Sequence, residues 1–193
     1  GESLIDVGTG AGFPGMVIKI LRPEVNVTLL DGHAKRFIFL EDLQNKLGVK
    51  TENLHIRAEL AAKEEKYREK FNYATARAVA RLNTLCEYCM PFVKKGGYFV
   101  AMKGEKGKEE ADEAKKAISV LGGELVDIIN TTVPEFEYLH TLVVIKKTKQ
   151  ICLVFFITIF CLLGLLGSAA GCKFLLEGAG VLHVLGVCHC ETV

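Results

Sequence analysis

The sequence predicts an α/β fold, with a mostly parallel, doubly wound sheet and an antiparallel strand near its end. Two observations carry this prediction. Short apolar and β-branched runs alternate with segments of helical period from residue 3 to residue 121. The last two strand-like runs, 124–129 and 139–146, then follow each other too closely for a crossover helix, so they should pair antiparallel.

In the first half of the chain, buried strands alternate with helices. SLIDVG is a continuous apolar run and VNVTLLD is rich in β-branched residues, as expected of strands in a parallel sheet. Pro14 suits the first turn of a helix, where no amide hydrogen is needed, and Gly48 suits a helix end. The expected elements are strand 3–8, helix 14–21, strand 25–31, helix 35–47 and strand 53–57.

The second half continues the alternation. Pro91 should end one helix. Another helix, at 106–121, is strongly charged, with Ala111, Ala114 and Ile118 on an inward face, and we interpret its charges as a solvated face. The expected elements are strand 71–77, helix 81–90, strand 97–103, helix 106–121, and strands 124–129 and 139–146.

Charge divides the chain into two parts near residue 150. The sequence has 24 Lys and Arg and 23 Asp and Glu, yet only Lys173, Glu177 and Glu191 of these lie in 151–193. We therefore interpret 1–150 as one domain of ordinary globular composition and 151–193 as an apolar tail. The net charge of +1 does not by itself indicate a class of binding partner.

The tail has three interpretations. Residues 151–172 carry no charge and are long enough to span a bilayer as a helix, which would make the tail a membrane anchor and the membrane a partner. Alternatively, the tail is apolar sequence packed on the domain, or an out-of-frame coding end. At the other end, the chain opens directly on a core strand, which predicts an N-terminally truncated protein.

Cys86 and Cys89 form a lone CxxC inside a predicted helix. Residues three apart share one helix face, so we interpret the pair as two core thiols, with a redox pair as the alternative. No second CxxC follows at the spacing of a zinc site, and we therefore expect no metal.

The turn DVGTGAGFPG after the first strand predicts a nucleoside-containing cofactor. Its glycines allow positive φ and let a ligand approach the backbone at the following helix N-terminus. Two fingerprints fit: GxGxxG, which is typical of dinucleotide binding, and an acid, Asp6, two residues before the GxGxG that starts at Gly8, which is typical of S-adenosylmethionine-dependent methyltransferases. Asp31 ends the second strand and could accept both ribose hydroxyls of either cofactor.

Six blocks resemble the RsmG (GidB) family, in the family's order: DVGTGAGFPG, TLLDGHAKRFIFL, IRAE, ATARAVARLNTL, AMKG and LVVIKK. The resemblance covers about residues 3–149 and implies a Rossmann-like, S-adenosylmethionine-dependent methyltransferase fold. It also implies methyl transfer to N7 of a guanine in small-subunit (16S) ribosomal RNA, with the small ribosomal subunit as partner. We expect a cytoplasmic monomer. The alternatives are an NAD-dependent oxidoreductase of Rossmann type and an inactive cofactor-binding fragment.

The resemblance also implies site residues. The cofactor site falls on Asp6, Gly8, Gly10, Gly12, Phe13, Asp31, Ala58 and Glu59, and RNA binding falls on Lys35, Arg57, Arg77 and Lys103. Because Arg57, Arg77 and Lys103 also end three successive strands, they should meet at the cofactor's edge of the sheet. Arg77 and Lys103 are our candidates for positioning the guanine, whose N7 needs no base because its lone pair is free. His140 stands where the family usually has arginine.

Overall fold

The computed structural model describes residues 1–132 and 139–151. All the helices and strands of these residues belong to one compact unit, Gly1–Gln150. In chain order they are β1 (Ser3–Val7), α1 (Gly15–Leu21), β2 (Asn26–Asp31), α2 (Ala34–Leu47), β3 (Glu52–His55), α3 (Ala58–Ala61), β4 (Phe71–Arg77), α4 (Leu82–Cys89), β5 (Val93–Lys103), α5 (Gly107–Val120), β6 (Gly123–Thr132) and β7 (Leu139–Lys147).

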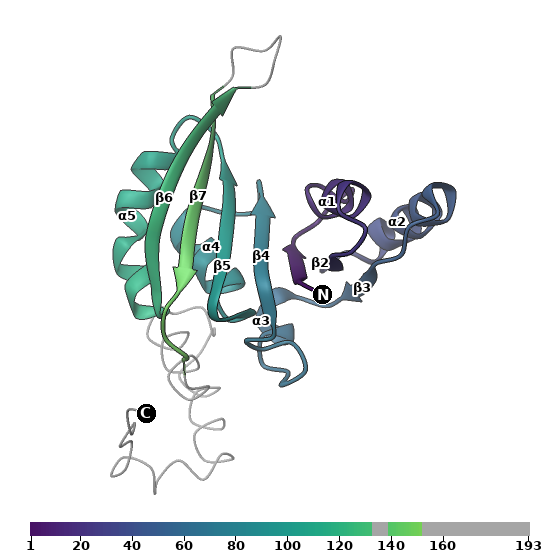
Figure 1. Ribbon diagram of the computed structural model, residues 1–193, viewed down its shortest axis with the longest axis horizontal. Helices are drawn as coiled ribbons and strands as arrows, with labels where there is room; N and C mark the ends of the chain where they lie inside the picture. The colour runs from purple at the N-terminus through teal and green to yellow at the C-terminus, as the bar shows by residue number, and fades with distance from the viewer. Residues whose placement is uncertain (133–138, 152–193) are drawn as a thin grey trace, which may run out of the picture. The chain divides into compact units, whose positions relative to one another are not determined.

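The strands form one sheet in the order β3-β2-β1-β4-β5-β7-β6 (Figure 1). β1 pairs in parallel with β2 on one side and with β4 on the other, and β3 and β5 extend the parallel sheet outward. β7 lies antiparallel between β5 and β6. The predicted fold class, including the antiparallel pairing of the last two strands, is therefore confirmed.

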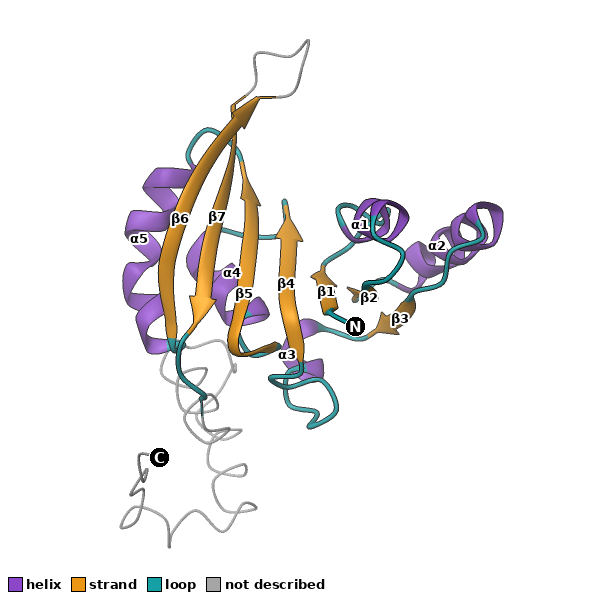
Figure 2. Cartoon of the chain, in the orientation of Figure 1, coloured by secondary structure: helices purple, strands orange, loops and turns teal. Residues whose placement is uncertain are grey.

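Helices cover both faces of the sheet (Figure 2). The chain moves from β1 towards β3 in the first half and from β4 towards β6 in the second. Since parallel crossovers are right-handed, this reversal places α1 and α2 on one face and α4 and α5 on the other. The two directions separate between β1 and β4, and the carboxyl ends of these strands form the switch point at which open α/β sheets bind ligands.

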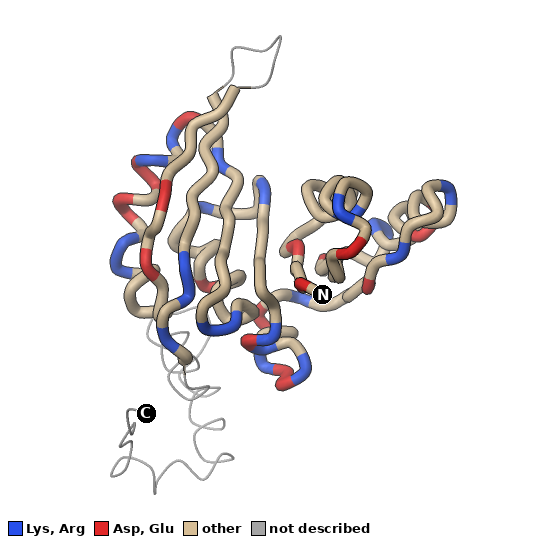
Figure 3. Tube along the Cα trace, viewed as in Figure 1, with Lys and Arg blue, Asp and Glu red and all other residues tan. Residues whose placement is uncertain are grey.

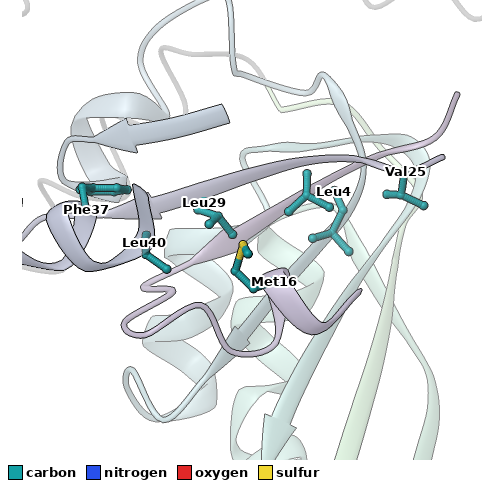
Figure 4. Close-up of a cluster of buried hydrophobic side chains, with 7 residues drawn as sticks. Leu4, Met16, Val25, Leu29, Phe37 and Leu40 are labelled. Atoms are coloured by element: carbon teal, nitrogen blue, oxygen red, sulfur yellow. The ribbon is translucent and has the colours of Figure 1, made fainter. Parts of the chain in front are cut away.

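One hydrophobic cluster joins α1 and α2 to the sheet (Figure 4). It combines buried side chains of both helices with those of β1, of β2 and of Val25, the residue before β2. The residues are Leu4, Met16, Val25, Val27, Leu29, Phe37 and Leu40. This cluster fixes the glycine-rich turn between β1 and α1, because both ends of the turn are anchored in it.

Several observed elements differ from the expected ones. β3 ends at His55, so Arg57 lies beyond the strand, directly before α3, and β6 runs to Thr132, three residues past the expected end. β5 begins at Val93, four residues before the expected strand, and a helix absent from the prediction, α3, spans Ala58–Ala61. A four-residue helix has too few positions to show a helical period, so sequence patterning could not detect it.

Cys86 and Cys89 are fully buried on α4 and are not joined by a disulfide. Burial raises the pKa of the Cys86 thiol to about 12 and raises that of Cys89 well above its ordinary value. Both cysteines are therefore uncharged core thiols at neutral pH, as we predicted, and their burial withholds them from redox partners.

The predicted membrane segment, 151–172, lies outside the described residues except for Ile151. Within 1–132 and 139–151, no helix is both long enough and apolar enough to cross a bilayer.

Two neighbouring apolar residues of α2 test the hydrophobic cluster. Leu40 is fully buried, whereas the side chain of Ile38 is 72% exposed. We expect Leu40→Ala to lower the free energy of unfolding by about 2–5 kcal/mol, because it leaves a cavity in the cluster. Ile38→Ala should change it by about 0.5 kcal/mol or less. Urea unfolding followed by circular dichroism measures both, and equal losses would contradict the assigned core.

Candidate cofactor and substrate site

The candidate site lies at the switch point, where a buried carboxylate holds the glycine-rich turn. Asp6 is fully buried near the end of β1. Its Oδ2 accepts a hydrogen bond from the Thr9 hydroxyl at 2.6 Å and another from the Gly15 backbone amide at 2.9 Å. Asp6 therefore joins the start, middle and end of the turn.

Burial of the Asp6 carboxylate disfavours its charged form. Burial raises its pKa to about 6, even though the hydrogen bonds from Thr9 and Gly15 and the charge of Arg77 act in the opposite direction. Its second oxygen, Oδ1, has no hydrogen-bond partner among the described residues. A buried acceptor without a donor is unusual and marks a position where a donor from a ligand would be favourable.

The turn requires glycine at two positions. Gly12 has a φ of +93°, and a Cβ there would lie 2.6 Å from Cγ of Met16. A Cβ on Gly15 would lie 2.8 Å from Oδ2 of Asp6. The turn is thus packed against both the hydrophobic cluster and the Asp6 carboxylate, so no side chain fits beneath it.

A second carboxylate, that of Asp31, ends β2 beside the turn. Its side chain is 2% exposed. Its oxygens accept hydrogen bonds from the Gly10 amide (3.0 Å), the His33 amide (3.0 Å) and Nη1 of Arg36, and Nδ1 of His33 lies 3.2 Å away. Burial raises the pKa of Asp31, but the hydrogen bonds from Arg36, Gly10 and His33 outweigh burial and leave the pKa below its ordinary value. Asp31 is therefore ionised at neutral pH.

Asp31 opens onto a cavity of about 350 Å³, within the size range of small-ligand sites. The cavity combines carboxylates, backbone of the turn and apolar side chains. Its lining residues are Val7, Gly8, Leu30, Asp31, Gly32, His33, Arg36, Arg57, Ala58, Glu59, Ala78, Val79 and Tyr88. An acid for ribose hydroxyls beside apolar walls for a base suits a nucleoside, so the residues present fit the cofactor expected from the sequence. We call this space the nucleoside cavity.

A second cavity, of about 640 Å³, lies at the carboxyl ends of β4 and β5. It is lined by Arg77, Ala78, Met102, Lys103, Gly104, Glu110, Thr131, Thr132, His140 and Leu142. Ala78 lines both cavities, so the two spaces adjoin at this residue. We call the larger space the acceptor cavity.

The Lys103 ammonium is bonded to other groups of the protein. Its side chain is 9% exposed, and its ammonium lies 2.8 Å from Oε2 of Glu110 and donates to the Ala80 carbonyl at 2.8 Å. The same Glu110 oxygen accepts a hydrogen bond from the Leu82 amide at the start of α4 (2.8 Å). Lys103 and Glu110 therefore fix the connection from β4 to α4, which includes the shared wall residue Ala78.

Charges of both signs lie along α5, as the predicted solvated face requires (Figure 3). Glu110 departs from that prediction, because its side chain is only 19% exposed and is bound to Lys103 and α4. Helical periodicity assigned Glu110 to the outer face, and only the packing of α5 beside α4 reveals its partners.

The predicted cofactor residues fall into three groups in the structure. Gly8, Asp31, Ala58 and Glu59 line the nucleoside cavity. Asp6 and Gly12 shape the turn, and the Gly10 amide donates a hydrogen bond to Asp31. Phe13 lines neither cavity and is 47% exposed, with the Arg77 guanidinium carbon 5.1 Å from the centre of its ring.

The predicted RNA-binding residues are not all brought together. Arg77 and Lys103 both line the acceptor cavity. Arg57 instead lines the nucleoside cavity, where it pairs with Glu59 at 2.7 Å, because β3 lies on the far side of β1 from β4. Lys35 is exposed at the start of α2 and lines neither cavity. Strands that follow one another in the sequence are therefore not always neighbours in the sheet, since β4 pairs with β5 but not with β3.

The sequence prediction missed three site residues. Arg36 reaches Asp31, Tyr88 closes one wall of the nucleoside cavity, and Glu110 neutralises Lys103. Arg36 follows Asp31 by five residues, and the start of a helix after a strand brings such a residue back over the strand end. This spacing is the one clue that could have identified it.

Known proteins resemble the chain in sequence and in fold. The sequence model of the GidB family, rRNA small subunit methyltransferase G, matches residues 1–136. Ribosomal RNA small subunit methyltransferase G of Lactobacillus helveticus is 52% identical over 151 residues, which cover 78% of this chain and 63% of that protein. The protein of the same name from Clostridium novyi is 51% identical over 150 residues, covering 77% and 62%. The chain thus spans less than two thirds of these relatives.

Solved structures share the fold at low sequence identity. The 16S rRNA (adenine(1408)-N(1))-methyltransferase W203A mutant of Catenulisporales acidiphilia, solved with its cosubstrate S-adenosylmethionine, has a TM-score of 0.62 at 13% identity, covering 78% of this chain and 87% of that one. A geranyl diphosphate methyltransferase has a TM-score of 0.57 at 12% identity, covering 77% and 79%. The sheet is therefore that of methyltransferases.

The raised pKa of Asp6 predicts a pH dependence of stability. Because the folded-state pKa, about 6, lies above the ordinary value of 3.8, the folded chain holds an extra proton between these values, and this contribution to stability falls as pH rises through the window. Two pKa units correspond to at most about 3 kcal/mol. Asp6→Asn keeps the shape and cannot titrate, so wild type should lose stability relative to it from pH 4 to pH 7. Urea unfolding at several pH values measures the difference, and parallel curves would refute the assignment.

The Lys103–Glu110 pair can be tested against an exposed pair on the same helix. Glu110→Gln leaves a largely buried ammonium without its counter-charge and should cost about 1–3 kcal/mol of unfolding free energy. Glu113 pairs with Arg81 at 2.6 Å, but both side chains are more than half exposed, so Glu113→Gln should cost about 1 kcal/mol or less. Thermal unfolding compares the two, and a larger effect at Glu113 would contradict the role of Glu110.

Proposed function

Because the chain belongs to the rRNA small subunit methyltransferase G family, also called RsmG or GidB, we propose that it transfers a methyl group from S-adenosylmethionine to N7 of a guanine in 16S ribosomal RNA. The partner is the small ribosomal subunit, the location is the cytoplasm, and the chain acts as a monomer. Family membership favours S-adenosylmethionine over the dinucleotide that the glycine pattern also allows.

The observation that carries the proposal is the meeting of two cavities at Ala78. The nucleoside cavity offers Asp31 to a ribose, and the acceptor cavity offers Arg77 to a nucleotide. A methyl donor and its acceptor must lie within near-attack distance, which adjoining cavities allow. The size of the acceptor cavity, about 640 Å³, suits one base taken out of its stack.

The chemistry needs little from the protein besides alignment. When bound, S-adenosylmethionine supplies an electrophilic methyl group on a sulfonium. Guanine N7 attacks with its own lone pair, so no side chain has to remove a proton. Arg77 is exposed and lines the acceptor cavity, so it can donate to a phosphate or to the O6 and N7 edge of guanine, as arginine commonly does. Glu110 already neutralises the charge of Lys103, so Lys103 acts here by fixing the connection from β4 to α4 that borders the acceptor cavity.

The decisive experiment incubates the chain with labelled S-adenosylmethionine and small ribosomal subunits that lack the modification. Nucleoside mass spectrometry should detect 7-methylguanosine in 16S rRNA, and calorimetry should detect S-adenosylhomocysteine binding. Binding without methylation would favour the alternative of an inactive cofactor-binding fragment. Binding of NAD in place of S-adenosylhomocysteine would overturn the methyltransferase assignment.

Arg77→Ala tests the acceptor side of the site. A side-chain contact to a base is worth about 1–3 kcal/mol, so we expect the methylation rate to fall by about 5- to 150-fold while S-adenosylhomocysteine affinity stays the same. The assay is run at pH 8, above the pKa of about 6 of Asp6, because loss of the Arg77 charge raises that pKa. Arg22, paired with Glu24 at 2.5 Å after α1, lines neither cavity and provides the control Arg22→Ala. An unchanged rate for Arg77→Ala would exclude this role.

A further inference from the structure

Both carboxylates of the nucleoside cavity are covered by an arginine. Arg36 is bonded to Asp31, and Arg57 pairs with Glu59 at 2.7 Å. Arg36 and Arg57 also line the cavity themselves. The groups expected to receive a nucleoside are therefore already engaged before one arrives.

Asp31 has little acceptor capacity left for a ligand. A carboxylate offers about four lone-pair positions. The Gly10 amide, the His33 amide and Arg36 donate to three of these positions, and the ring Nδ1 of His33 lies 3.2 Å from Oδ1, so at most one position is open. A ribose presents two further hydroxyl donors, so at least one of the present donors must leave when a nucleoside binds.

Arg36 is the donor that can leave at the lowest cost. The Gly10 and His33 amides belong to the backbone that shapes the site, and moving them would disturb the turn. The side chain of Arg36 is 45% exposed and flexible, and its Nη1 lies 3.9 Å from where a Cβ of Gly10 would stand, over the open side of the turn. Water can solvate the guanidinium as soon as it leaves Asp31.

We propose that Arg36 is a displaceable cap on the ribose-binding carboxylate, so that a nucleoside ligand must exchange its ribose hydroxyls for the Arg36 guanidinium. The proposal rests on the proposed function only in taking the cavity as a nucleoside site. Arg36 thereby lowers the affinity for the cofactor and keeps Asp31 ordered and ionised in the ligand-free protein. It is a residue that sets affinity, and it is distinct from the groups that react.

Arg36→Met removes the cap and keeps the length of the side chain. We expect it to bind adenosine and S-adenosylhomocysteine about three- to tenfold more tightly than wild type, which corresponds to about 0.7–1.4 kcal/mol. Isothermal titration calorimetry measures the homocysteine ligand, and ligand-detected NMR titration measures adenosine. Arg22→Met removes an equivalent exposed arginine outside both cavities and should leave both affinities unchanged.

Two further arms separate the cap from a general effect of charge. Since 2′,3′-dideoxyadenosine lacks the 2′ and 3′ hydroxyls that compete for Asp31, Arg36→Met should bind it no more tightly than wild type. In an Asp31→Asn background, the cap has lost its charged partner, so adding Arg36→Met should change adenosine affinity by about twofold or less.

The outcomes distinguish this inference from the proposed function. If wild type binds S-adenosylhomocysteine and Arg36→Met binds it equally or more weakly, Arg36 contacts the ligand or is uninvolved, and only the cap is refuted. A gain that persists with dideoxyadenosine also refutes it. If neither protein binds any adenosine ligand, the nucleoside site itself is wrong and both proposals fail.

Discussion

The buried carboxylate of Asp6 is the interaction on which the ligand-binding edge of this protein depends. Its Oδ2 bonds to Thr9 and Gly15 and draws the turn between β1 and α1 tightly over the hydrophobic cluster. The packed turn also positions the Gly10 amide, which donates a hydrogen bond to the Asp31 carboxylate. A charge is costly in such an interior, as the raised pKa of Asp6 shows, and the protein accepts this cost at the point where backbone amides must face a ligand.

Electrostatic pairing at this edge follows a consistent arrangement. Asp31, Glu59 and Glu110 each hold a nearby arginine or lysine, so the two adjoining cavities contain opposite charges that are largely neutralised within the protein. Arg77 differs, since its guanidinium lies over the Phe13 ring and stays exposed. A net charge of +1 is therefore compatible with an RNA substrate, because one well-placed cation can contribute more to recognition than the overall charge.

Most of the fold could be predicted from local patterns. Strands buried on both faces are continuous apolar runs, so the strands of the sheet could be predicted. The glycine-rich turn indicates the switch point, so the ligand-binding edge could be predicted as well. The four-residue helix α3 was not, because it is shorter than the period that reveals helices. The site was predicted less completely. Asp31 and Glu59 line the nucleoside cavity. Arg57 was expected to meet Arg77 and Lys103 at the cofactor's edge of the sheet, but it lines the nucleoside cavity apart from them, because β1 and β2 lie between β3, which precedes Arg57, and β4, which ends at Arg77.

The sequence by itself determined the alternation of strands and helices, the glycine turn with its two acids, and the family. The alternation and the turn are recognised from short stretches of sequence, and the family from six short blocks spread over residues 3–149. Only the tertiary structure decided which charges are available to a ligand. Glu110 withdraws Lys103 from the surface and Arg36 covers Asp31, and both effects arise where separate elements pack together. Whether an ionised side chain binds a ligand or a neighbour depends on that packing, because the free energy of a charge is set by its partners and by its distance from water.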